Sequence, residues 1–213
     1  MKRTDQSLNE APESTSNITS ICVFCGSNPG NHPRYVELAI ETGTAIAQHG
    51  SRLVYGGGGL GLMGATARAA HNSGGAVLGI IPEFLKNVEM LLEDIEHEIV
   101  PDMATRKKHM YEESQAFIVL PGGIGTLEEA IEVLSWMRLQ LHQKPMVFLD
   151  NDDYWEPLFA LFNHTIDRNF SPEWMRDDVF SASSAEEALK LIEDKWENPG
   201  PLRDLSGVPL EKV

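Results

Sequence analysis

Residues Leu120 to Glu129 read Leu-Pro-Gly-Gly-Ile-Gly-Thr-Leu-Glu-Glu, directly after an apolar run that begins at Ala116. The run predicts a buried strand at 116–120, and the residues from Thr126 onward predict a helix at 126–140. Glycines in a strand-to-helix turn let backbone N–H groups face an anion, where the helix dipole favours negative charge. This stretch therefore predicts a phosphate-binding loop at the end of a central strand.

The same alternation of strand and helix extends along the chain on both sides of this loop. Further apolar runs predict strands at 18–25, 52–55, 76–81, 97–100, 145–149 and 178–180. Amphipathic stretches predict helices at 33–49, 62–73, 103–114, 154–169 and 185–196. Continuous apolar strands joined by helices are typical of a parallel sheet that is covered on both faces. We therefore predict an α/β fold, a Rossmann-like doubly wound parallel sheet with helices on both faces.

The length of 213 residues fits one domain with a full hydrophobic core. Residues 1–17 are polar and lack periodicity, which predicts a disordered N-terminal tail. Residues 18–197 are expected to form a single Rossmann-like nucleotide-binding domain, and 198–213 an extended C-terminal tail. Ligands of such sheets bind at the carboxyl ends of the strands. The glycine-rich turns at 26–30, 56–64 and 122–125 all fall at this edge and so locate the site.

The net charge of −15 excludes several classes of partner. Non-specific binding to nucleic acid or to an anionic membrane needs a basic surface, so neither partner is expected. The chain has no apolar run of 18 residues and no signal peptide at its N-terminus, which predicts a cytoplasmic protein. A phosphate ligand must then be held by N–H groups and a few local cations.

Metal and redox chemistry are not indicated by the cysteines or histidines. Cys22 and Cys25 lie inside the predicted strand at 18–25, where residues three apart face opposite sides of the sheet. The pair is therefore expected to be two buried thiols rather than a redox or zinc motif. The seven histidines lack the spacing of metal ligands, so we predict no metal and no cofactor.

A second glycine motif offers a different interpretation. Residues 59–64 match G-x-G-x-x-G after a predicted strand, and Glu83 follows at about the distance of the dinucleotide fingerprint. An NAD(P)-dependent oxidoreductase is therefore an alternative. However, the motif follows the second strand rather than the first, and a separate phosphate loop exists at Gly122. Close packing of a helix on the sheet explains these glycines more simply.

Charged residues beside the glycine turns suggest chemistry on a bound nucleotide. Arg106 and Lys107 open the predicted helix at 103–114, near the sheet edge that carries the glycine turns, and an Arg there can bind a phosphate or a ribose hydroxyl. Glu128 and Glu129 lie one turn inside the helix that follows the phosphate loop. Adjacent helical residues point about 100° apart, so we expect only one of these two glutamates to face the ligand.

These residues together resemble the LONELY GUY family, the cytokinin riboside 5′-monophosphate phosphoribohydrolases that often carry the label of lysine decarboxylases. The resemblance covers most of residues 20–150. It rests on Cys25-Gly26-Ser27, Tyr55 to Gly58, Gly61 to Gly64, Gly79 to Pro82, Met103-x-x-Arg106-Lys107-x-x-Met110, Pro121 to Glu129, Trp136 and Lys144-Pro145. The sequence departs from the family pattern at Ser135, which replaces a threonine, and at 138–142.

The resemblance implies a role for each matching residue. Arg106 and Glu129 are the implied catalytic pair. The implied substrate-binding residues are Ser27, Gly57, Glu89, Arg106, Lys107, Gly122, Gly123, Ile124, Gly125, Thr126, Leu127, Glu128 and Ser135.

The expected reaction is hydrolysis of the N-glycosidic bond of an N6-modified adenosine 5′-monophosphate, which gives a free base and ribose 5-phosphate. The alternatives are an AMP nucleosidase and a non-catalytic nucleotide or cofactor carrier of the same fold. The lysine decarboxylase label is not supported, because nothing in the sequence marks a Schiff-base lysine with a pyridoxal phosphate site. The resemblance also implies a homodimer that uses the helix at 126–140, and assembly into hexamers stays open.

Overall fold

The computed structural model describes residues 18–200, so the tail expected at 1–17 and all but the first three residues of the tail expected at 198–213 lie outside the described residues. Seven parallel strands form one sheet in the order β4-β3-β2-β1-β5-β6-β7. The strands are β1 (Ser20–Phe24), β2 (Arg52–Tyr55), β3 (Val77–Pro82), β4 (Glu96–Val100), β5 (Ala116–Val119), β6 (Met146–Leu149) and β7 (Phe180–Ala182). The helices are α1 (Pro33–His49), α2 (Gly61–Asn72), the 3-10 helix η1 (Glu83–Leu85), α3 (Met103–Glu112), α4 (Ile124–Arg138), α5 (Glu156–Asp167), α6 (Met175–Asp178) and α7 (Ala185–Glu197).

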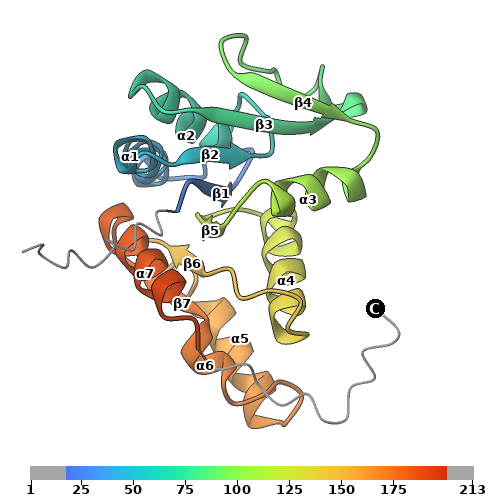
Figure 1. The fold of residues 1–213 in the computed structure, drawn as a ribbon. Coiled ribbons are helices and arrows are strands. Elements are labelled where there is room, and N and C mark those ends of the chain that lie inside the picture. The colour runs from blue at the N-terminus through green and yellow to red at the C-terminus, as the bar shows by residue number, and fades with distance from the viewer. Residues whose placement is uncertain (1–17, 201–213) are drawn as a thin grey trace, which may run out of the picture.

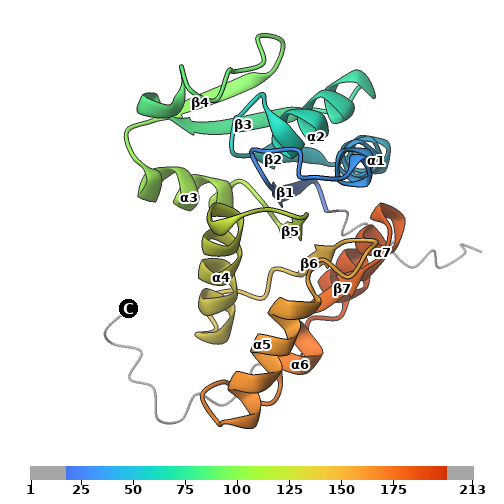
Figure 2. The ribbon, with the colours of Figure 1, turned by 180° about the vertical axis from the view of Figure 1, so that it is seen from behind.

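Helices cover both faces of the sheet, which confirms the predicted fold class (Figures 1 and 2). Alternate side chains of β1 point to opposite faces of the sheet and contact different helices. Ile21 and Val23 belong to a core cluster with residues of α1, α2 and α7, whereas Cys22 and Phe24 belong to a second cluster with α3, α4 and α5. Because both faces are buried at the centre of the sheet, the central strands β5 and β6 are apolar along their whole length, whereas the edge strand β4 carries Glu96, His97 and Glu98.

The two cysteines lie as the strand pattern predicts. Cys22 and Cys25 are buried and free, and they belong to the two different core clusters. Among residues 18–200, no group of three or more His, Cys, Asp or Glu side chains could hold a metal ion. Within the same range, no helix is both long and apolar enough to span a bilayer.

The order of the strands creates one switch point. From β1 the chain adds strands outward to β4, then returns to the other side of β1 and adds β5 to β7. The loops after β1 and β5 therefore leave neighbouring strands in opposite directions, which opens a crevice at their carboxyl ends. Gly26 and Gly122 lie in these two loops, where the N–H of Gly26 donates to the carbonyl of Pro121 at 3.1 Å.

Several predicted boundaries differ from the observed ones by a few residues, and two of these differences have a clear local cause. The helix expected from Thr126 begins at Ile124, because the N–H of Leu127 already donates to the carbonyl of Gly123. The strand expected at 178–180 is instead the short helix α6 followed by β7, which pairs with β6 from Phe180 onward. Arg176 links α6 to the end of α5 through an ion pair with Asp167 and also pairs locally with Glu173, and the apolar pattern reveals neither contact.

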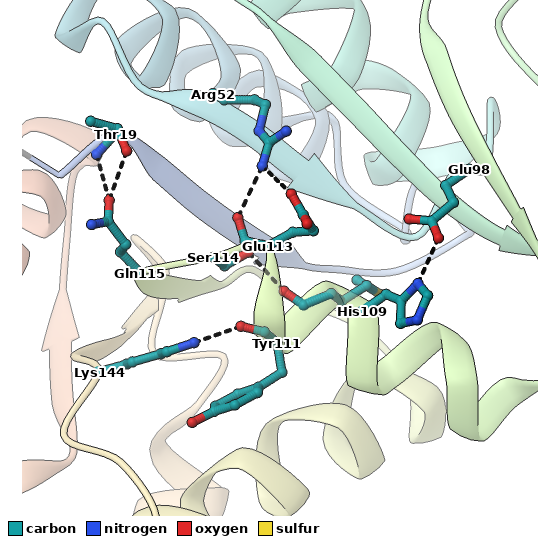
Figure 3. A network of polar contacts seen from close by, with 10 residues as sticks. Thr19, Arg52, Glu98, His109, Tyr111, Glu113, Ser114, Gln115 and Lys144 are labelled. Carbon is teal, nitrogen blue, oxygen red and sulfur yellow. Dashed lines mark hydrogen bonds and ion pairs between the residues drawn. The ribbon is translucent and has the colours of Figure 1, made fainter.

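The C-terminal end of α3 and the segment after it are tied to the sheet by a polar network (Figure 3). Arg52 of β2 donates to both the carbonyl and the carboxylate of Glu113. Lys144 reaches across from the loop before β6 and donates to the carbonyl of Tyr111 at 2.7 Å. At the opposite end, the carboxylate of Asp102 caps α3 by accepting the N–H of Thr105. The C-terminal end of α3 is therefore fixed to the sheet, and its N-terminus is capped locally.

Candidate active site

The N-terminus of α4 is open toward the crevice. Gly123 is its N-cap residue, and no side chain caps the helix. A Cβ atom added to Gly123 or Gly125 would meet nothing within 4 Å. The first N–H groups of a helix have no partner within the helix, so here they are available to an anion. This geometry agrees with the phosphate loop predicted from the glycines.

Arg106 projects from α3 across the ends of two strands. Its Nε donates to the carbonyl of Ile80 at the end of β3, and its Nη2 donates to the carbonyl of Gly56 just after β2, at 3.2 and 3.1 Å. The side chain is buried, and its guanidinium occupies the space that a side chain at Gly56 would need. These bonds fix the direction of the cation inside the crevice.

Glu129 lies beside this cation, one turn into α4. Its Oε1 is 3.7 Å from the Nη2 of Arg106, and the residue is only 9% exposed. Burial raises the pKa of the Glu129 carboxyl from 4.5 to about 7, and the positive charge of Arg106 limits that rise. A carboxyl group with a pKa near neutrality can exchange a proton at physiological pH, as a general acid or base must.

Glu128 has a different environment. It is exposed at the rim and forms an ion pair with Lys107, which also binds Glu132 at 3.1 Å. Both Glu128 and Glu129 border the cavity, which corrects the expectation that only one of the two faces it. Their environments still divide their roles, because Glu129 is buried beside Arg106 whereas Glu128 is solvated and neutralised by Lys107.

The crevice forms a cavity of about 500 Å³. The predicted site residues that line it are Ser27, Glu89, Arg106, Gly122, Gly123, Ile124, Gly125, Thr126, Glu128 and Glu129. They come from the loops after β1 and β5, from the segment after η1, and from α3 and α4. The topology therefore brings together residues that are about 100 positions apart in the sequence.

Four predicted residues do not line the cavity of this chain. Gly57 has a φ of +81° and lies against Ile81, so its role in the fold is a turn that only glycine adopts readily. The ammonium group of Lys107 is paired with Glu128 and Glu132 on α4. Leu127 packs against the core, and Ser135 is exposed near the far end of α4.

The structure adds lining residues that sequence reasoning missed. The principal ones are Asn28, Tyr35, Met63, Met103 and Tyr154. The hydroxyl of Tyr154 donates to the carbonyl of Gly122 at 2.7 Å, and its ring meets that of Tyr35 edge-on at 5.8 Å. A tyrosine in a turn carries no signal of its own. Only the adjacency of β5 and β6 brings Tyr154 to the phosphate loop.

An open helix N-terminus at the switch point of a doubly wound sheet places this chain among the Rossmann-like proteins that bind phosphorylated ligands at that edge. Residues 63–192 match a family model described as "Possible lysine decarboxylase". The cytokinin riboside 5′-monophosphate phosphoribohydrolases LOG7 and LOG1 of Arabidopsis thaliana are each 42% identical to the chain over 183 residues. The match covers 85% of this chain and 84% and 86% of theirs. The chain belongs to this family, the LONELY GUY family.

Solved structures support the fold independently. The molybdenum cofactor carrier protein of Chlamydomonas reinhardtii superimposes with a TM-score of 0.65 at 20% identity, covering 85% of this chain and 99% of that protein. The molybdenum cofactor binding protein of Rippkaea orientalis gives a TM-score of 0.63 at 24% identity, covering 83% and 96%. At such identities the likeness shows the architecture alone.

Proposed function

We propose that this chain hydrolyses the N-glycosidic bond of an adenosine 5′-monophosphate that carries an N6 substituent, releasing the free base and ribose 5-phosphate. The observation that carries the proposal is the buried carboxyl of Glu129, 3.7 Å from Arg106 and one turn from an open anion-binding loop. The printed names of the Arabidopsis relatives describe the same reaction class.

In the proposed mechanism, positive charge develops on the ribose as the bond between C1′ and the base nitrogen breaks. The carboxylate of Glu129 stabilises that charge and accepts a proton from the attacking water. The water oxygen forms the new bond to C1′, and the departing base takes up a proton from solvent, which balances the proton that Glu129 accepts from the attacking water. Arg106, held by two backbone carbonyls, orients the nucleotide and balances the charge of Glu129.

The phosphate loop accounts for the choice of a nucleotide over a nucleoside. The free N–H groups at the start of α4, on residues 123–126, are the proposed donors to the 5′-phosphate. The chain is acidic overall, so its general field repels an anion and the local donors must supply the affinity. Removal of the phosphate from the substrate should therefore weaken binding far more than a change in the base.

A lysine decarboxylase fits the site less well than a hydrolase does. Pyridoxal phosphate enzymes bind their cofactor through a Schiff base to a lysine. Within residues 18–200, the side chains that line the cavity include no lysine. A carrier of the same fold needs the phosphate loop but has no use for a buried acid beside an arginine.

Incubation of the purified protein with AMP and with N6-isopentenyladenosine monophosphate would test the proposal, with free base followed by chromatography. A higher kcat/KM for the N6-modified nucleotide supports the proposal, whereas faster release from AMP makes the enzyme an AMP nucleosidase. Binding of both nucleotides without release of base would identify a carrier. The homodimer and the cytoplasmic location expected from the sequence stay predictions, which light scattering and cell fractionation would test.

A further inference from the structure

Three consecutive carbonyl groups precede the open N-terminus of α4, and each accepts a hydrogen bond. The carbonyl of Pro121 accepts the N–H of Gly26, and the carbonyl of Gly123 accepts the N–H of Leu127, both at 3.1 Å. The carbonyl of Gly122, between them, accepts the hydroxyl of Tyr154 at 2.7 Å. Two of these donors are backbone groups fixed by the fold. The third is a side chain from the turn after β6, more than 30 residues away.

We propose that Tyr154 is a positioning residue that sets the phosphate specificity of this loop. The inference rests on the proposed function and names a determinant of that same site. The lone pairs of a carbonyl oxygen without a hydrogen-bond donor repel a phosphate, and the phenolic hydroxyl of Tyr154 supplies a donor to the oxygen of Gly122. The Gly122 carbonyl and the Gly123 N–H also belong to one planar peptide group, so the bond from Tyr154 fixes the direction of that N–H.

The turn that carries Tyr154 is built to hold it. The carboxylate of Asp150 accepts the backbone N–H groups of Asp152, Tyr154 and Trp155, at 3.0 to 3.2 Å. Asp153 adopts a left-handed conformation with a φ of +62°, which lets the chain reverse direction there.

Neighbouring rings hold the aromatic ring of Tyr154 on two sides. The ring contacts Trp155 edge-on at 4.8 Å and Tyr35 at 5.8 Å. Tyr35 is held in turn by Asp152, whose Oδ2 accepts its hydroxyl at 3.2 Å. The ring therefore has little freedom to leave the Gly122 carbonyl.

The substitution Tyr154→Phe tests the proposal, because it removes the hydroxyl and keeps the ring. We expect the KM for the nucleoside monophosphate, and the inhibition constant of ribose 5-phosphate, to rise about five- to tenfold, the value of one hydrogen bond. Inhibition by free adenine should not change, and kcat should stay within about twofold of wild type. Tyr111→Phe is the matched control, since Tyr111 lies on α3 outside the cavity lining.

Other outcomes would overturn the proposal. One is an inhibition constant for ribose 5-phosphate that does not change in Tyr154→Phe. The other is equally weaker inhibition by ribose 5-phosphate and by adenine in a Tyr154→Phe protein that melts at the wild-type temperature. If Tyr154→Phe unfolds, Asp150→Asn is measured instead, with a smaller shift in the same direction expected. If the wild-type protein releases no base, the proposed function fails, but calorimetric titration with AMP still tests the loop. Tyr154→Phe must then bind AMP about five- to tenfold more weakly than wild type, and equal affinity refutes the role of Tyr154.

Discussion

Two of the three glycine-rich turns at the sheet edge, those after β2 and β5, look alike in sequence but serve opposite purposes. In the turn after β2, a Cβ atom on Gly59 would overlap the carbonyl oxygen of Met90, and one on Gly58 would lie 2.6 Å from the carboxylate of Glu89. In the loop after β5, added Cβ atoms on Gly123 and Gly125 would meet nothing. The turn after β2, here called the crowded turn, is filled by the protein itself. The loop after β5, here called the open loop, leaves space for a ligand beside Gly123 and Gly125.

This difference shows why a glycine motif alone cannot identify a binding site. Glycine allows a close approach of the backbone, and the approaching group is either another part of the protein or a ligand. The G-x-G-x-x-G pattern at 59–64 belongs to the first case, because Cβ atoms on its three glycines would overlap the backbone of Met90, Ser27 and Gly59. The interpretation as close packing agrees with this geometry.

The largest loss of activity is expected at the contact between Arg106 and Glu129, which connects the two turns. Arg106 binds the carbonyl of Gly56 in the crowded turn, and Glu129 lies on the helix that follows the open loop. Substitution Glu129→Gln should lower kcat about 10²- to 10⁴-fold, because it removes the proposed general base. Steady-state release of base measures the loss. Glu132→Gln, on the same helix but outside the cavity lining, should stay within about twofold of wild type. Near-normal turnover in a folded Glu129→Gln protein would remove Glu129 from the mechanism.

The titration of Glu129 should affect activity and stability in opposite directions. The carboxylate is the active form, so kcat/KM should rise with pH through about 7. Because the folded-state pKa lies above the unfolded value of 4.5, the folded state binds more protons between these two values. Stability due to this group is thus complete below about pH 4.5 and is lost as pH rises to about 7, by about 3 kcal/mol.

Chemical denaturation at several pH values would measure this loss as the difference between wild type and Glu129→Gln. The variant has no titrating group at this position and should lack that component of the slope. Parallel curves for the two proteins would show that the carboxyl of Glu129 titrates normally.

Substitution of a glycine in the crowded turn should lower the free energy of unfolding. Gly59→Ala forces a methyl group against the backbone at Met90, and such overpacking typically costs about 1–3 kcal/mol. The free energy of unfolding in urea measures this cost. Gly123→Ala is the matched substitution in the open loop and should not lower stability. Equal destabilisation by the two substitutions would abolish the distinction between the turns.

Substitution of a glycine in the open loop should weaken nucleotide binding without changing stability. The methyl group of Gly123→Ala enters the space reserved for the anion, so we expect the KM for the nucleotide to rise about two- to tenfold, with an unchanged melting temperature. Thermal unfolding and initial-rate measurements on the same preparation check both expectations. A normal KM would place the 5′-phosphate elsewhere in the cavity.

Sequence patterns predicted the strands well, because burial on both faces makes every residue of a central strand apolar, as in β5 and β6. They failed at α6, because a helix of four residues, Met-Arg-Asp-Asp, is too short to show periodicity, and its Arg176 pairs with Asp167 at the end of α5. Arg106 and Glu129 were predicted as site residues because motifs surround them, and both line the cavity. Tyr154 was missed because its partner at Gly122 is brought near only by the pairing of β5 with β6.

The switch point between β1 and β5 also couples ligand binding to folding. The cavity takes Ser27, Glu89 and Arg106 from the first half of the fold, and 122–129 from the second. An unfolded or half-assembled chain cannot present this set, so a nucleotide binds only the complete sheet. Mass action then makes the ligand a stabiliser, by about 3 kcal/mol at a concentration 100 times its Kd. The concentration of nucleotide in the cell would in this way set the free energy of unfolding of the chain.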